Sequence, residues 1–169
     1  MRHEIMEVID DNESSSLDYD TVTKKLKYLQ QVVDESLRLL PPGLIFTTRQ
    51  AKEDFEWNGL RFRAGTCIMS PTYQVQTDPR YWPDPLVFDP DRFSPEGIVH
   101  KMAHQPFGLG PRRCVGMRMA STTIKYTLAR ILMKFKLELG QKQKDTLTIL
   151  GHGMASVPAT GPWIIFRRL

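Results

Sequence analysis

Hydrophobic side chains recur at helical spacing in three stretches of the chain, residues 1–9, 24–40 and 117–135. In each stretch the apolar positions lie three or four residues apart, which predicts an amphipathic helix buried along one face. The second stretch ends at the Pro-Pro-Gly of residues 41–43, because proline disfavours helix in the residue before it and glycine permits a turn. Residues 10–23 are polar and acidic, and they predict a linker between the first two helices.

Short β segments are predicted in two other stretches, residues 44–70 and 136–169. In the first stretch, Glu53–Trp57 and Leu60–Arg63 flank Asn58-Gly59, a dipeptide typical of a two-residue hairpin turn. In the second stretch, strands are predicted at residues 136–139, 146–150 and 163–167. The stretch between them, residues 71–116, carries prolines at positions that forbid long regular elements, and a loop of this length is more often functional than accidental.

Composition narrows the class of protein. The 169 residues, 41% hydrophobic and 25% charged, are typical of one globular domain. The two cysteines, Cys67 and Cys114, cannot form a disulfide scaffold and suit a reducing compartment. The net charge of +4 is not gathered into one tract, so nucleic acid is not a favoured partner. No apolar run approaches the ~18 residues of a membrane span.

The loop Phe107-Gly-Leu-Gly-Pro-Arg-Arg-Cys-Val-Gly116 carries a cysteine immediately before a predicted helix. The positive end of that helix favours the thiolate of Cys114, and Gly116 and Ala120, four residues apart, share a face nearly bare of side chains. A flat ligand fits that face, and Arg112 is placed to meet an anionic group on it, so the pattern describes a thiolate-ligated haem. The alternative is a buried structural cysteine. Zinc is disfavoured, since no second cysteine or nearby histidine has ligand spacing.

Glu35 and Arg38 are three residues apart on the predicted helix and can pair. A solvated surface pair of little energetic value is the alternative. Glu35 lies opposite the main apolar stripe, yet further apolar residues share its side, which predicts burial of the pair. These residues are Tyr28, Val32 and Leu39. A buried pair needs further partners, and Arg92 of the proline-rich loop is a candidate partner for Glu35.

The three patterns together resemble the C-terminal part of a cytochrome P450, the haem-thiolate monooxygenase family. The pattern F-x-x-G-x-R-x-C-x-G is matched at Phe107, Gly110, Arg112, Cys114 and Gly116, with Ala120 following; E-x-x-R at Glu35 and Arg38; and P-x-R-F at Pro90, Arg92 and Phe93. The likeness covers nearly the whole chain and looks closest to microsomal eukaryotic members of the thromboxane-synthase-like, detoxifying clan. It implies an α+β, mainly α, fold with small antiparallel sheets and a long cysteine-loop segment, of which this chain is an incomplete domain.

The resemblance also implies roles for individual residues. Cys114 would be the axial ligand of the haem iron, Arg112 would bind a haem propionate and Phe107 would shield the thiolate. Gly110, Gly116 and Ala120 would complete the cofactor-binding loop. Glu35, Arg38 and Arg92 would form a structural triad behind the haem, and residues 44–48 and 151–160 would reach toward substrate.

Two positions depart from the family pattern. The arginine that often binds the second propionate has its nearest candidate in Arg49, one position late. A histidine common before the Asp-Pro of the loop is replaced by Gln76.

The implied activity is oxygen insertion into a small lipophilic substrate, with dioxygen and with electrons from a reductase, at the endoplasmic reticulum membrane. The membrane anchor and the oxygen-activating helix would lie outside this chain. A basic face for the reductase is expected around the cysteine loop, from Arg112, Arg113, Arg118, Lys125, Arg130 and Lys134. Two alternatives stay open, a haem-thiolate isomerase that acts on a peroxide and a truncated, non-catalytic chain.

Overall fold

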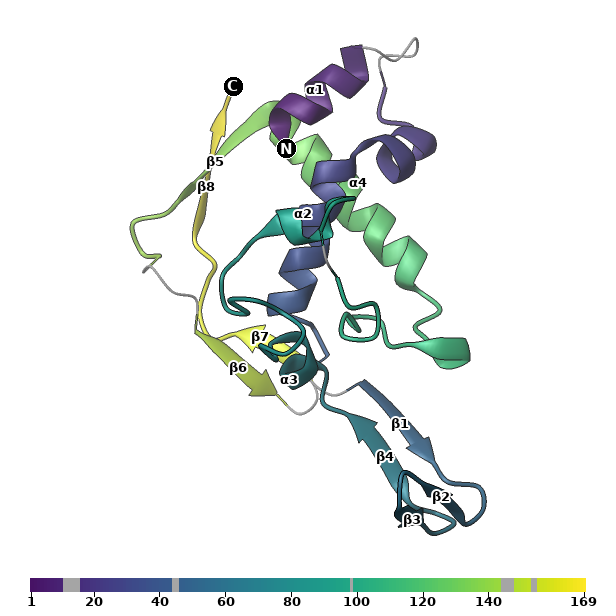
Figure 1. The fold of residues 1–169 in the computed structure, drawn as a ribbon. Coiled ribbons are helices and arrows are strands. Elements are labelled where there is room, and N and C mark those ends of the chain that lie inside the picture. The colour runs from purple at the N-terminus through teal and green to yellow at the C-terminus, as the bar shows by residue number, and fades with distance from the viewer. Residues whose placement is uncertain (11–15, 44–45, 98, 144–147, 153–154) are drawn as a thin grey trace.

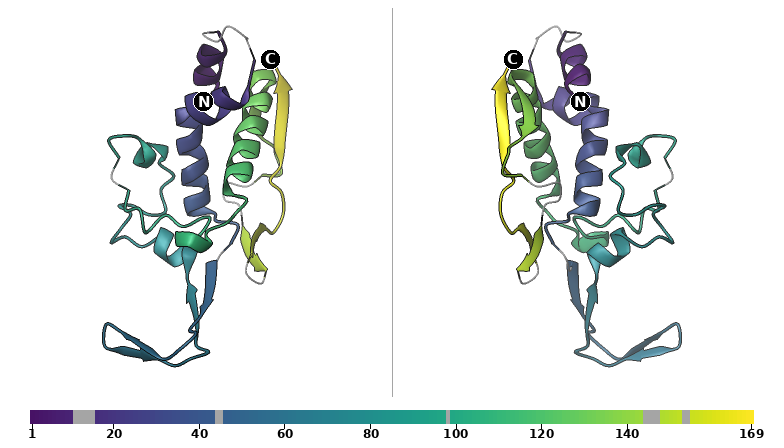
Figure 2. Two further views of the ribbon diagram at one scale, coloured as in Figure 1. Left: turned by 90° about the vertical axis from the view of Figure 1, so that its right-hand side faces the viewer. Right: turned by 90° about the vertical axis from the view of Figure 1, so that its left-hand side faces the viewer.

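Three helices form the core of the molecule. In the computed structural model, which describes residues 1–10, 16–43, 46–97, 99–143, 148–152 and 155–169, these helices are α1 (Arg2–Asp10), α2 (Lys27–Leu39) and α4 (Met117–Lys134). Helices α2 and α4 run side by side, and α1 packs across their upper ends (Figures 1 and 2). Their apolar faces meet in a buried cluster of Ile5, Ile9, Leu26, Leu29 and Ala129. The helices predicted at residues 1–9 and 117–135 are therefore confirmed within one or two residues.

The predicted start of the second helix, at residue 24, is wrong. A π-helical turn, η1 (Thr21–Lys25), precedes a break at Leu26, and α2 begins only at Lys27. The backbone N–H of Thr21 donates to the carboxylate of Asp18 at 2.7 Å, which anchors the separate turn. Residues 21–23 therefore do not belong to a linker, while residues 11–15 lie outside the described part of the chain.

Both ends of α2 are capped by side chains from distant segments. At its start, the carboxylate of Glu4 accepts the backbone N–H groups of Tyr28 (2.6 Å) and Leu29 (3.0 Å). At its end, the buried side-chain amide of Gln76 donates to the carbonyl oxygens of Leu37 (3.1 Å) and Arg38 (2.9 Å). Helix ends carry unpaired backbone groups, so these caps replace the water that a buried end cannot reach. They fix α2 to α1 at one end and to the proline-rich segment, residues 71–116, at the other.

The described strands form two-stranded antiparallel sheets around this helical core (Figure 1). The pairs are β1 (Phe46–Gln50) with β4 (Cys67–Ser70), β2 (Phe55–Trp57) with β3 (Leu60–Phe62), β5 (Phe135–Leu139) with β8 (Ile164–Arg168), and β6 (Ile149–His152) with β7 (Ala155–Pro158). The turn between β2 and β3 has Asn58 and Gly59 in the left-handed region, with φ of 50° and 76°, which confirms the predicted hairpin.

Strand β7 lies in the segment 151–160, for which the sequence predicts a loop, so that prediction is wrong at residues 155–158. It pairs with β6 and is held to the chain after α2, where the backbone N–H of Ser156 donates to the carbonyl of Pro42 at 2.9 Å. Of the other predicted β segments, residues 44–45 and 146–147 lie outside the described residues, as do residues 153–154 of this segment.

The segment 71–116 is irregular apart from three short helices. These are α3 (Thr72–Gln76) and the 3-10 turns η2 (Pro90–Phe93) and η3 (Gly110–Arg112). The described residues of this segment hold no long regular element, as the prolines predict, but the interpretation of the whole stretch as a loop is wrong at α3, a five-residue helix that precedes the first Asp-Pro. None of the helices in the described ranges has the length and apolar character needed to cross a bilayer.

Gly97 allows the turn after η2 to fold back on itself. A Cβ atom at this position would overlap the backbone carbonyl oxygen of Arg92, because the two backbones touch. We predict that Gly97→Ala lowers the free energy of unfolding by about 1–3 kcal/mol, the usual cost of overpacking. Chemical denaturation measures the change. The control is Glu96→Ala, an exposed neighbour, and equal effects of the two substitutions would contradict the prediction.

Candidate functional site

A fully buried ion pair lies at the centre of the site. The Nε of Arg38 donates to Oε2 of Glu35 at 2.6 Å, and neither side chain has exposed surface. The rest of the guanidinium donates to Oε1 of Glu35 (2.8 Å) and to the backbone carbonyls of Gln76 (2.8 Å), Pro85 (2.7 Å) and Val87 (3.3 Å). All five N–H donors of Arg38 therefore have acceptors, which offsets the cost of removing the cation from water.

The carboxylate of Glu35 collects further partners from the proline-rich segment. Its Oε1 also accepts the backbone N–H of Asp89 at 2.9 Å and lies 3.5 Å from Nε of Arg92. The guanidinium of Arg92 is fixed in turn by donation to the carbonyl of Asp84 at 3.0 Å. The structure thus brings Glu35, Arg38 and Arg92 together, with Arg92 as a second cation near the carboxylate.

Aromatic rings cover the pair on another side. The guanidinium of Arg38 lies 5.1 Å from the ring centroid of Trp82, a cation–π contact with a buried indole whose N–H donates to the carbonyl of Val75. Phe93 and His104 pack against Trp82 and against each other, with ring centroids 4.8–6.3 Å apart. This cluster joins η2 to the segment that leads into the cysteine loop.

The cysteine loop is closed by one backbone hydrogen bond. The N–H of Cys114 donates to the carbonyl of Phe107 at 2.8 Å, so the two ends of the loop face each other. Gly108 and Gly110 have φ of 71° and 74°, and this left-handed conformation at two positions gives the loop its tight turn. Cys114 is left half-buried at the entrance to α4.

The residues that follow the thiol at the start of α4 are small or apolar. Gly116 has an ordinary φ of −82°, and a Cβ atom there would meet only the Cys114 sulfur, at 3.8 Å. The protein's own packing therefore does not require glycine at this position, and its bareness leaves space beside the thiol. Ala120 follows one turn later, and the nearby side chains of Val115 and Met119 are 103% and 77% exposed.

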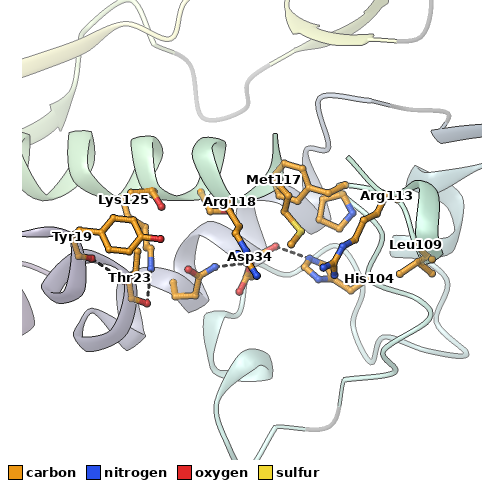
Figure 3. Close-up of a pocket in the computed structure, with 16 residues that line it drawn as sticks. Tyr19, Thr23, Asp34, His104, Leu109, Arg113, Met117, Arg118 and Lys125 are labelled. Atoms are coloured by element: carbon orange, nitrogen blue, oxygen red, sulfur yellow. Dashed lines mark hydrogen bonds between the residues drawn. The ribbon is translucent and has the colours of Figure 1, made fainter. Parts of the chain in front are cut away.

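The opposite face of α4 borders a groove of about 740 Å³ whose lining combines apolar and charged side chains (Figure 3). Helix α4 lines it with Met117, Arg118, Ser121, Thr122 and Lys125, and the cysteine loop lines it with Phe107, Gly108, Leu109, Gly110 and Arg113. At ~100° per residue, these helical positions point away from Gly116 and Ala120. The cationic side chains that line the groove and the helix face of Gly116 and Ala120 thus lie on different sides of the cysteine loop.

The prediction that Lys125 belongs to the exposed basic face is wrong. Lys125 is only 3% exposed, because its ammonium turns inward and donates to the carbonyl of Thr23 at 3.4 Å. Burial lowers the pKa of Lys125, against the opposing attraction of Asp34 and Glu4. The other five cations of that prediction are exposed, namely Arg112, Arg113, Arg118, Arg130 and Lys134.

The comparison with known proteins decides the family. Residues 1–163 match the family model of cytochrome P450. The chain belongs to the cytochrome P450 family. This family is one of haem-containing oxidoreductases, so membership implies a haem iron and monooxygenase chemistry at the level of the family.

Three curated relatives show how much of such a protein the chain represents. Cytochrome P450 3A41 of Mus musculus is 38% identical over 138 residues, which are 80% of this chain and 27% of the relative. Probable cytochrome P450 9h1 of Drosophila melanogaster is 36% identical over 172 residues, 97% of this chain and 32% of the relative. Thromboxane-A synthase of Mus musculus is 38% identical over 134 residues, 78% of this chain and 25% of the relative. The chain thus spans about a quarter to a third of the length of the curated relatives it matches.

The residues of this cytochrome P450 chain fit a haem held by one protein ligand. Among the described residues, no three His, Cys, Asp or Glu side chains gather into a group that would hold a metal ion by themselves. A haem iron needs only an axial ligand, since the macrocycle supplies the other donors, and Cys114 stands alone beside open space. Arg112 is exposed at the end of η3, whereas Arg49 lies on β1, opposite Ile68.

Sequence reasoning missed the polar residues that connect these parts. Gln76 was noted only as a departure from the family pattern, and it is a fully buried hydrogen-bonding residue. His104 and Asp34 lie 70 positions apart, yet Nε2 of His104 lies 3.3 Å from the carbonyl of Asp34. No periodic pattern marks such contacts, because their partners are distant in sequence.

Burial shifts the pKa values of two groups beside the groove. Burial lowers the pKa of His104 to about 4, helped by the nearby Arg38 guanidinium and opposed by its backbone partner and by Glu35. Burial also raises the pKa of Asp34, against the hydrogen bond from Gln30. His104 is therefore neutral near pH 7, with its Nε2–H donating to a carbonyl that can only accept.

Loss of the central carboxylate is expected to destabilise the chain strongly. Glu35→Gln leaves the fully buried Arg38 cation without its carboxylate and removes the nearer anion of Arg92, so we predict a loss of about 3–5 kcal/mol in the free energy of unfolding. The matched control is Asp20→Asn, which breaks an exposed pair with Lys24 (3.0 Å) and is expected to cost ~1 kcal/mol or less. Similar losses in the two variants, measured by chemical denaturation, would show that burial of the pair has no special weight.

His104 is expected to make stability fall in mild acid. Its folded pKa of about 4 lies below the unfolded value of roughly 6.5, so the unfolded chain binds the proton first. The free energy of unfolding should therefore fall by about 3 kcal/mol as pH drops from roughly 6.5 to 4.

His104→Gln should remove most of this slope while keeping a donor for Asp34. The control is His3→Gln on the exposed face of α1, which should leave the slope unchanged. Because Asp34 is present in every variant, the difference between the curves isolates His104. Parallel curves for His104→Gln and the unmodified protein would refute the assignment.

Proposed function

We propose that this chain supplies the thiolate-side part of a haem-thiolate monooxygenase, with Cys114 as the axial ligand of the haem iron. The observation that carries the proposal is a half-buried free cysteine beside Gly116, where the protein's own packing does not require a glycine, with the small Ala120 one turn further along the helix. A thiolate-ligated haem supplies activation of dioxygen, because electron donation from sulfur favours O–O cleavage.

The loop residues have distinct roles in this proposal. Arg112, exposed beside the loop, binds a propionate of the haem by a charge-assisted hydrogen bond. Phe107 holds the backbone of Cys114 through its carbonyl and shields the sulfur with its ring. Gly110 sets the turn, and Gly116 and Ala120 leave room for the flat macrocycle.

Glu35, Arg38 and Arg92 have a structural role in the proposal rather than a chemical one. Their charged groups are directed at one another and at backbone carbonyls of the proline-rich segment. They hold that segment in place, and with it the start of the cysteine loop. Arg49, on β1, is not assigned to a propionate.

Electrons are proposed to come from a reductase that docks on the cationic side of the cysteine loop. Arg113 and Arg118 line the groove on the face of α4 opposite Gly116, so an acidic partner there would lie behind the thiolate (Figure 3). Complementary charge raises the rate of encounter and makes it sensitive to salt. The small lipophilic substrate, dioxygen and the endoplasmic reticulum membrane belong to this proposal at the level of the whole protein.

Haem binding tests the proposal directly. Cys114→Ser is expected to abolish the thiolate-ligated haem spectrum of the native polypeptide, because a serine hydroxyl does not replace the thiolate. Cys67→Ser, at the exposed cysteine of β4, is the matched control and should leave the spectrum unchanged. An unchanged spectrum in Cys114→Ser would refute the ligand assignment. Failure of the unmodified chain to give that spectrum on haem titration would favour a non-catalytic chain.

Isomerisation of a peroxide is the second candidate. The relative named thromboxane-A synthase is as similar to this chain, at 38% identity, as cytochrome P450 3A41. Monooxygenation consumes reducing equivalents, whereas rearrangement of a peroxide needs none. Product formed from a hydroperoxide in the absence of a reductase would favour the isomerase, and strict dependence on the reductase would favour the monooxygenase.

A further inference from the structure

The buried side chain of Gln76 connects the end of α2 to the beginning of the cysteine loop. Its amide nitrogen donates to the carbonyls of Leu37 (3.1 Å) and Arg38 (2.9 Å), and its amide oxygen accepts the backbone N–H of Gln105 at 2.7 Å. The side chain has no exposed surface. The orientation of the amide is fixed by chemistry, since carbonyls only accept and a backbone N–H only donates.

Gln76 and Arg38 hold each other in place. The Arg38 guanidinium donates to the backbone carbonyl of Gln76 at 2.8 Å, while the Gln76 amide donates to the backbone carbonyl of Arg38. The position of Gln76 is therefore determined by the buried ion pair. The hydrogen bond that the Gln76 amide oxygen accepts from Gln105 then fixes the segment that leads to the cysteine loop.

Gln105 is held in place two residues before the cysteine loop begins at Phe107. Its carbonyl accepts the N–H of Gly108 at 3.0 Å, and two residues after Gln105 the carbonyl of Phe107 accepts the N–H of Cys114 at 2.8 Å. The Oε1 of Gln105 also accepts the hydroxyl of Ser70 at 2.9 Å. Hydrogen bonds, joined by short covalent stretches of backbone, thus link the Glu35–Arg38 pair through Gln76 and Gln105 to the backbone of Cys114.

We propose that Gln76 is a positioning residue for the Cys114 loop, and that it sets the loop by presenting two donors to α2 and one acceptor to Gln105 at every pH. The inference deepens the proposed function and rests on it, because it concerns the placement of the proposed haem ligand. The glutamine amide does not titrate, whereas a histidine or glutamate at position 76 would change its donors and acceptors with pH.

Substitution of Gln76 should therefore give opposite pH responses. A neutral imidazole in Gln76→His retains one donor and one acceptor, but the imidazolium carries donors only and faces the N–H of Gln105. In Gln76→Glu the carboxylate faces two carbonyls, whereas the protonated acid donates to one of them and accepts from Gln105. Burial and these partners lower the folded pKa of the histidine and raise that of the glutamate. Lowering the pH should therefore harm Gln76→His and help Gln76→Glu.

The experiment follows haem retention and the thiolate-ligated spectrum of the native polypeptide from about pH 8 to 5.5, a range that spans the ordinary histidine pKa. The matched controls are Gln74→His and Gln74→Glu, at an exposed position on the same helix α3. We expect Gln76→His to resemble the unmodified protein at pH 8 and to lose haem retention about tenfold relative to Gln74→His at pH 5.5. Gln76→Glu should change in the opposite direction.

A second readout does not require haem. The rate at which iodoacetamide alkylates Cys114, measured by mass spectrometry of the peptide that carries it in a Cys67→Ser background, reports the position of the loop. The Gln76 variants should change this rate with the same opposite pH trends, relative to the Gln74 variants at each pH. If the proposed function fails, with the same haem spectrum in Cys114→Ser, this readout still tests Gln76.

Two results would overturn the inference. One is parallel pH responses of the Gln76 and Gln74 variants in both readouts. The other is a lower melting temperature of the Gln76 variants with an unchanged Cys114 alkylation rate and an unchanged spectrum of the bound haem. The second result would make Gln76 a contributor to stability alone.

Discussion

The structure depends on the removal of the Glu35–Arg38 pair from water. Two charges without exposed surface are costly unless every donor and acceptor finds a partner. The partners come from the irregular segment after α3, where the carbonyls of Pro85 and Val87 and the N–H of Asp89 point at the pair. This irregular stretch is thereby held in one conformation by its hydrogen bonds to the Glu35–Arg38 pair.

Helix α2 carries this pair between two side-chain caps from distant segments. The Glu4 carboxylate accepts at its first turn, and the Gln76 amide donates at its last. Negative charge at the start of a helix and donors at its end both suit the helix dipole. The caps therefore tie two separate parts of the chain, α1 and the segment that begins at α3, to opposite ends of one helix.

The sequence predicts features whose cause is local. The spacing of apolar residues predicts α4, and Asn58-Gly59 predicts the hairpin, because helix period and turn chemistry act over a few residues. The break at Leu26 and the strand β7 escape prediction, since they depend on Asp18 and on the chain beyond α2. The same limit applies to the site. Glu35 and Arg38 are three residues apart and visible as a motif, while the Gln76–Gln105 contact spans 29 residues of loop.

The placement of Cys114 follows from how few contacts its loop makes for itself. Gly108 and Gly110 permit the turn but add no side-chain packing, and one hydrogen bond from Cys114 to Phe107 closes it. Inside the loop the 3-10 turn η3 is closed by the N–H of Arg113 on the carbonyl of Gly110 at 3.1 Å, and the contacts at the ends of the loop set where this turn lies. One end continues into α4 and the other is held at Gln105. The buried ion pair is therefore linked to the backbone of Cys114 through Gln76 and Gln105, at the end of the loop away from α4.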